Sequence, residues 1–110
     1  MSTPYPTGER VLEALGTATR RQILALLSPG PRAVGEIAAV LPITRPAVSK
    51  QLRVLEDASL VVFSIDGSRR VYRLCERGFD VARRYLDGFW DEALTRFQTL
   101  VDIESDGDAQ

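Results

Sequence analysis

The chain has 110 residues, enough for one domain, and its 14 Lys and Arg residues nearly balance its 15 Asp and Glu residues. Overall charge therefore gives no indication of nucleic acid, and any basic surface must be local. One cysteine excludes a disulfide within the chain, and the lack of histidine removes the commonest general base and metal ligand. No apolar run could span a membrane and residues 1–8 do not resemble a signal peptide, so we expect a cytoplasmic protein.

The first part of the chain predicts a flexible N-terminus followed by three short helices with apolar residues at helical spacing. The expected segments are residues 1–8 for the terminus and residues 9–15, 18–28 and 34–41 for the helices. Gly16 ends the first helix and Thr17 caps the second, which buries Ile23, Leu24 and Leu27. Prolines follow the second and third helices and end both.

A fourth helix is predicted over residues 44–58. Thr44 offers a capping hydroxyl, and Pro46 falls in the first turn, where its missing N–H is harmless. The spacing buries Val48, Leu52 and Leu55 and leaves the polar residues outward. Because only a short turn separates this helix from the third, the two must cross at a large angle, as in a helix-turn-helix.

The outward face of this fourth helix predicts contacts with DNA. Arg45 lies at the N-terminal end, where an arginine can bond guanine O6 and N7 together. Ser49 and Gln51 offer further base-edge or phosphate contacts, whereas Lys50 and Arg53 suit phosphates, which position a protein without reading sequence. Taken by itself, the same pattern also fits a solvated amphipathic helix on a small helical domain.

A basic β-hairpin is predicted after this helix, with strands at residues 60–65 and 71–74. Asp66-Gly67 is a turn signal, and Ser68, Arg69 and Arg70 form a tip that could reach the DNA backbone or minor groove as a wing. An exposed turn with two solubilising arginines is the alternative. Residues 44–74 carry six cations and three anions, a net charge of +3, which concentrates positive charge on this part of the fold.

The last part of the chain predicts a long amphipathic helix from Phe79 and a disordered acidic tail over residues 104–110. The core is already supplied by earlier elements, so the wide aromatic stripe suggests a partner surface. A symmetric dimer would set two recognition helices about 34 Å apart. Predicted dimerisation residues are Val11, Leu12, Leu86, Phe89, Trp90, Ala93 and Phe97. The alternative is a helix that folds back on its own domain.

These elements predict a mainly α fold with a small β-hairpin wing, in the order α-α-α-α-β-β-α, with one DNA-binding and dimerisation domain over residues 9–103. Cys75 follows the return strand in apolar surroundings, where we expect a buried structural thiol. The alternative is a redox switch through a disulfide between subunits.

Several of these segments resemble the ArsR family of winged-helix repressors. The resembling segments are residues 19–24, 34–38, 46–55, 60–61 and 67–72, and the likeness extends over residues 9–100. The resemblance implies a homodimeric, promoter-binding transcription factor, usually a repressor, whose first and last helices pair the subunits. Carried over by position, the DNA-facing residues are Thr44, Arg45, Pro46, Ser49, Lys50, Gln51, Arg53, Ser68, Arg69 and Arg70. Gln51 departs from the histidine of many members.

The chain also departs from the family's metal sites. Ala33 and Gly35 stand where thiolate sensors have cysteines, and the last helix offers Asp87, Asp91 and Glu92 without histidine. Soft or borderline metals prefer sulfur or imidazole, so we expect no metal and no cofactor. The chain resembles the metal-independent branch of the family, and its effector is unknown.

The sequence therefore predicts a sequence-specific DNA-binding regulator, a homodimeric repressor of a roughly palindromic operator in double-stranded DNA. Two alternatives are a winged-helix module used for protein–protein contact and a repressor switched by a thiol or metal signal. An enzyme is not expected, because without histidine no Ser-His-Asp or Cys-His pair can form. Gly67 stands alone, so no glycine-rich phosphate loop is present either.

Overall fold

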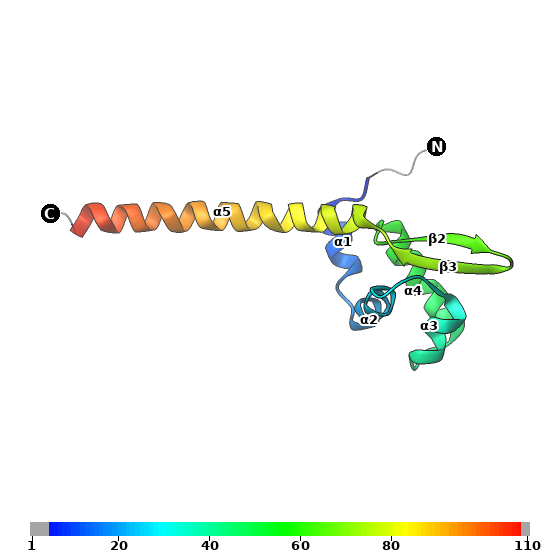
Figure 1. The fold of residues 1–110 in the computed structure, drawn as a ribbon. Coiled ribbons are helices and arrows are strands. Elements are labelled where there is room, and N and C mark those ends of the chain that lie inside the picture. The colour runs from blue at the N-terminus through cyan, green and yellow to red at the C-terminus, as the bar shows by residue number, and fades with distance from the viewer. Residues whose placement is uncertain (1–4, 109–110) are drawn as a thin grey trace.

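The computed structural model describes residues 5–108, and side-chain exposure over residues 5–104. The elements of this part are α1 (Gly8–Ala14), α2 (Ala18–Leu27), β1 (Arg32–Ala33), α3 (Val34–Val40), α4 (Arg45–Asp57), β2 (Val61–Asp66), β3 (Arg69–Leu74) and α5 (Glu76–Asp108). Figure 1 shows α1–α4 and the β2–β3 hairpin gathered at one end of α5, which projects far beyond them. The predicted class, mainly helical with a small hairpin, is confirmed.

Helices α2 and α4 begin where threonine side chains satisfy free backbone N–H groups. Thr44 Oγ1 accepts a hydrogen bond from the Ala47 amide at 3.2 Å, and Pro46 occupies the first turn of α4. Thr17 Oγ1 accepts in the same way from the Arg20 amide at 3.3 Å, at the start of α2. Each cap satisfies a donor that the helix itself cannot, so the starts of α2 and α4 are fixed by local sequence.

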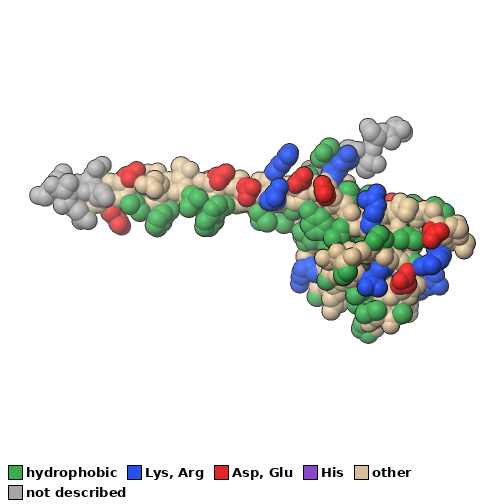
Figure 2. Space-filling view, in the orientation of Figure 1, with side chains coloured by type: hydrophobic (Ala, Val, Ile, Leu, Met, Phe, Trp, Pro, Cys, Tyr) green, Lys and Arg blue, Asp and Glu red, His purple; other side chains and the backbone are tan. Residues whose placement is uncertain are grey.

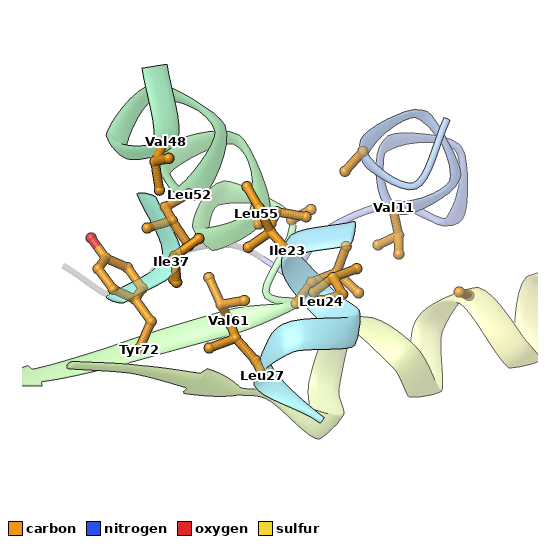
Figure 3. Packing of buried hydrophobic residues seen from close by; sticks show 14 residues of the cluster. Val11, Ile23, Leu24, Leu27, Ile37, Val48, Leu52, Leu55, Val61 and Tyr72 are labelled. Carbon is orange, nitrogen blue, oxygen red and sulfur yellow. The ribbon is translucent and has the colours of Figure 1, made fainter. Parts of the chain in front are cut away.

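The hydrophobic core fixes the orientation of α4. Val48, Leu52 and Leu55 are fully buried, as predicted. They pack with side chains from the other helices and the sheet, as Figure 3 shows. These partners include Val11, Ile23, Leu24, Leu27, Ile37, Val61 and Tyr72. Because one face of α4 is held in this way, its opposite face, with the cationic residues, must point to solvent.

The sheet has three antiparallel strands in the order β1-β3-β2. The register of β2 and β3 pairs Asp66 with Arg69, which leaves a two-residue turn at the tip of the wing. Gly67 has φ +64° there, a conformation that glycine adopts without strain in such hairpin turns. The short strand β1 was not predicted; it pairs with β3 through Arg32 and Ala33 and ties the start of α3 to the wing.

Both ends of the chain differ from expectation. The first helix starts at Gly8, Pro6 is buried and the Arg77 guanidinium lies 4.5 Å from the Tyr5 ring centroid, so part of the segment expected to be flexible packs on the domain. The last helix includes residues 104–108, which we expected to be disordered. No proline follows Glu76, so nothing in the backbone interrupts the helix there. Residues 1–4 and 109–110 lie outside the described residues.

Cys75 is half-buried rather than fully buried as expected. Its backbone amide donates to the Leu60 carbonyl at 2.9 Å, and its side chain lines an open depression with Phe63 and Arg77. Within residues 5–108, none of the helices is both long and apolar enough to cross a membrane.

Gly78→Ala should destabilise the domain by about 1–3 kcal/mol, because overpacking strains a close contact. A Cβ at this position would lie 2.5 Å from the Ser59 carbonyl oxygen and 2.6 Å from that of Ala58. The Gly78 amide also donates to Ser59 at 2.7 Å, so the start of α5 has little freedom to move away. Urea unfolding measures the change. Gly88→Ala, in the same helix with open space around it, is the control and should not destabilise. Equal stabilities of the two variants would contradict this packing.

Candidate nucleic-acid interface

The outward face of α4 carries the polar residues that the sequence analysis assigned to DNA. Arg45, Ser49, Lys50 and Arg53 are all exposed, on the side of the helix away from the core. Thr44 and Pro46 are exposed at its start, although the hydroxyl of Thr44 is engaged in the cap. This arrangement matches a helix that enters the major groove with its N-terminal residues first.

The wing lies beside the N-terminal half of α4. A groove of about 360 Å³ separates the two, and its lining residues come from α4, the wing and the start of α3. They are Ala33, Val34, Arg45, Ser49, Ser68, Arg69 and Arg70. Three arginines therefore converge on one groove from segments far apart in the sequence. Such a concentration of cations beside a protruding helix suits the phosphates that flank a major groove.

The arginines of the wing have partners within the subunit. Arg69 Nη2 lies 2.7 Å from Glu36 Oε1, and the same oxygen accepts from the Ala33 amide at 3.1 Å. The Arg70 guanidinium lies 4.6 Å from the centroid of the Phe63 ring. Glu36 lies 33 residues from Arg69, and its place at this site was not predicted from the sequence. These contacts connect the wing to the domain, and the ion pair with Glu36 engages Arg69 although its side chain remains exposed.

Arg45 lies against the start of α3. A Cβ added to Gly35 would be 3.4 Å from Arg45 Nη2, so the guanidinium covers this glycine. Contact between Arg45 and a base therefore requires rotation about its side-chain bonds, which an exposed arginine can make readily.

Gln51 does not face outward as we expected. Its side chain is half-buried, and its Oε1 accepts a hydrogen bond from Arg20 Nη1 at 3.1 Å. On α4 this position falls beside the buried stripe, closer to Val48 and Leu55 than to Lys50. The side-chain oxygen of Gln51, a residue that was expected to contact DNA, is therefore engaged within the subunit.

Comparison with known proteins identifies the family. A helix-turn-helix domain family matches residues 15–62, which contain α2, α3 and α4. The HTH-type transcriptional regulator Rv2034 of Mycobacterium tuberculosis is 48% identical over 106 residues, 96% of this chain and 98% of the relative. The homodimeric winged helix-turn-helix DNA-binding domain of Mb0332 from Mycobacterium bovis, a possible ArsR-family regulator, is 37% identical with a TM-score of 0.60, over 80% of this chain and 82% of that one. This chain belongs to the ArsR family of winged helix-turn-helix transcriptional regulators.

A further solved structure agrees with this assignment. The possible transcriptional regulator for arsenical resistance has a TM-score of 0.70 and 39% identity, and the match covers 82% of this chain and 94% of that chain. Since its relatives are transcriptional regulators and its matched domain is a helix-turn-helix, the ArsR-family regulator described here is a DNA-binding transcriptional regulator.

The long helix α5 of this regulator exposes the apolar stripe predicted for dimerisation. Figure 2 shows these side chains gathered along one side of the projecting helix. Trp90 is 64% and Phe97 63% exposed, and Leu86, Phe89 and Ala93 are exposed as well. The two predicted dimerisation residues on α1, Val11 and Leu12, are not exposed in this way.

Val11 belongs to the subunit's own core, which corrects its assignment to the dimer surface. It is 0% exposed, and Leu12 is half-buried against the same core. A short amphipathic helix has one apolar stripe, and that of α1 is already covered within the subunit. Of the predicted dimerisation residues, those on α5 are the exposed ones, whereas Val11 is buried and Leu12 is half-buried.

The family resemblance places metal ligands at the start of α3 and on α5. Ala33 is buried at the start of α3, and Asp87, Asp91 and Glu92 are exposed on α5. Within the described part of the chain, no three His, Cys, Asp or Glu side chains gather closely enough to hold a metal ion.

Glu36→Gln should raise the affinity for random duplex DNA severalfold, by about the effect of one added phosphate contact. The glutamine oxygen can still accept from the Ala33 amide, whereas the ion pair with Arg69 is lost and one negative charge beside the groove is removed. Because the pair is half-exposed, the free energy of unfolding should change by less than about 1 kcal/mol. Fluorescence anisotropy with a random duplex measures the change. Weaker binding would show that the ion pair is needed to hold the wing for DNA.

Proposed function

We propose that this protein is a homodimeric repressor that binds a roughly palindromic operator and occludes a promoter. The observation that carries the proposal is the arginine-lined groove between α4 and the wing. In this arrangement α4 of each subunit enters a major groove, and the wing lies along the neighbouring backbone. Both elements are held on one rigid core, so a subunit presents them to DNA as a unit.

The residues of this surface divide into two roles. Arg45, at the start of α4, is the candidate for base recognition, because a guanidinium can bond both acceptors of a guanine. Lys50, Arg53 and Arg70 are candidates for phosphate contacts, which give affinity without reading sequence. Ser49 and Ser68 supply short hydroxyls to the groove between them. Gln51 is assigned instead to the interior bond with Arg20.

The sequence of α5 supports pairing with a second copy. Leu86, Trp90, Ala93, Phe97 and Leu100 follow one another in alternating steps of four and three residues, the spacing of helices that pack side by side along their length. All five are exposed. Their stripe continues over nearly half of a helix that is about 50 Å long at 1.5 Å per residue.

The chemistry of the stripe favours an identical helix over a different partner. An apolar seam that repeats along a helix is complementary to itself, as a twofold interface requires. The Mb0332 domain, which shares the winged fold, is homodimeric. A dimer would also link two recognition helices, the α4 helix of each subunit, as a palindromic operator requires. These arguments support a homodimer held by α5.

Duplex binding as a function of salt tests the proposal. An operator is first selected from a pool of random duplexes, and its affinity is then measured from 50 to 200 mM salt. A DNA-binding protein that contacts several phosphates should bind the operator more tightly than random duplexes at every salt concentration. Its affinities for the operator and for random duplexes should both fall steeply as salt rises. The alternative, a winged-helix module for protein contacts, predicts no selected sequence and no duplex affinity at low micromolar concentration. That result would contradict the proposed function.

A further inference from the structure

Arg20, in the first turn of α2, forms hydrogen bonds with two other helices. Its Nε donates to the Ala14 carbonyl oxygen at 2.6 Å and its Nη2 to that of Glu13 at 3.1 Å, both at the end of α1. Its Nη1 donates to Gln51 Oε1, in the middle of α4, at 3.1 Å. A guanidinium carries five donors in a rigid plane and can serve three acceptors at once. One half-buried side chain therefore joins α1, α2 and α4.

The helix α1 is in turn fixed to α5. The ring of Tyr85 lies against the backbone of Gly8, where an added Cβ would be 2.3 Å from it. The Tyr85 hydroxyl also donates to Glu9 Oε1 at 3.5 Å. Arg20 thus connects the reading helix α4 to a helix that rests on α5, the proposed dimerisation helix.

Direct packing between α1 and α4 is incomplete. An open groove of about 640 Å³ runs between them, and its walls include Glu13 of α1 and Val54 and Asp57 of α4. Arg20 also lines this groove. The shared core packs α1 and α4 on the same cluster of buried residues, and beside this groove the hydrogen bond from Arg20 to Gln51 adds a defined polar link to α4.

We propose that Arg20 and Gln51 are positioning residues that hold α4 at a fixed angle to α1 and, through α5, to the second subunit. This inference rests on the proposed function, because it concerns a dimer on an operator with two half-sites. A change in the angle of α4 would misplace the reading residues of both subunits at once. Random DNA is bound mainly through phosphates, so its affinity should depend little on this angle.

Direct reading of DNA by Gln51 is the competing explanation, since a glutamine amide can bond adenine N6 and N7. The two explanations differ in how substitutions combine. If Gln51 acts through Arg20, substitution of either residue removes the same link. The double variant should then lose no more operator affinity than either single variant. If Gln51 contacts a base directly, the two losses add.

A double-mutant cycle on the selected operator separates these explanations. Gln51→Met keeps the length of the side chain but removes the acceptor, and Arg20→Lys keeps the charge but cannot reach all three acceptors. We expect each single variant and the double variant to lose operator affinity about tenfold, with random-duplex affinity unchanged. Arg21→Lys is the control, because Arg21 donates to the Leu15 carbonyl at 2.7 Å and should leave operator affinity unchanged.

Gln51→Glu provides a rescue variant. Its carboxylate still accepts from Arg20, so the ratio of operator to random-duplex affinity should stay near that of the wild type, although the added charge weakens both. Thermal unfolding and sedimentation confirm that each variant is folded and dimeric. The proposed role of the Arg20–Gln51 bond would be overturned by a double variant whose operator affinity falls about a hundredfold, or by single variants with full operator affinity. Absence of operator preference in the wild type would instead contradict the proposed function itself.

Discussion

Trp90→Glu is expected to convert the dimer into monomers and to lower operator affinity by about 10²–10⁴-fold, the gain that linkage of two binding sites provides. Trp90 is exposed in the subunit and lies within the stripe of apolar residues on α5. In a dimer it would be buried, and a carboxylate at that position would lose its hydration without gaining a partner. Sedimentation gives the mass, and anisotropy with the operator duplex gives the affinity.

Thr95→Glu is the matched control for this change. Thr95 lies on the side of α5 away from the stripe, where its hydroxyl donates to the Asp91 carbonyl at 2.9 Å. The added charge is the same, so any general effect on α5 or on repulsion from DNA appears in both variants. A dimeric Trp90→Glu protein with full operator affinity would contradict the assignment of α5 as the interface.

Arg45→Ala should cost about 1–3 kcal/mol of operator affinity and relax the preference at one base pair in each half-site. Arg45 lines the groove between α4 and the wing and lies at the end of α4 that enters the major groove first. Its removal leaves a base without its two hydrogen bonds, whereas the phosphate contacts remain. Selection from random duplexes with this variant should show which base has lost its preference.

Lys50→Ala serves as the comparison, because Lys50 is an exposed cation in the same helix. Loss of a phosphate contact should weaken operator and random duplexes equally and reduce the dependence on salt by about one counterion. If Arg45→Ala behaved in the same way, with an unchanged base preference, Arg45 would be a phosphate contact and not a reader of sequence.

The parts of the fold that local sequence determines were predicted correctly. The cap at Thr44, the proline in the first turn and the spacing of Val48, Leu52 and Leu55 define α4 without information from the rest of the chain. The turn at Gly67 defines the wing in the same way. Together these two segments were sufficient to predict the helix-turn-helix and its wing.

The parts that were missed depend on contacts between distant segments. Two residues are too few for a strand pattern, so β1 becomes visible only through its pairing with β3. The bond between Arg20 and Gln51 joins residues 31 apart, and nothing in either local sequence indicates it. Val11 was assigned to the wrong surface because an apolar stripe shows that a helix face is covered, but not by which subunit.

Two copies joined through α5 are expected to present their two α4 helices to DNA at one fixed separation. The most direct test measures the affinity of the dimer for operators whose half-sites are moved apart by five base pairs, about half a helical turn. The account predicts that this insertion lowers affinity to that of a single half-site, because the second site then faces the other side of the duplex. Unchanged affinity for the lengthened operator would contradict it.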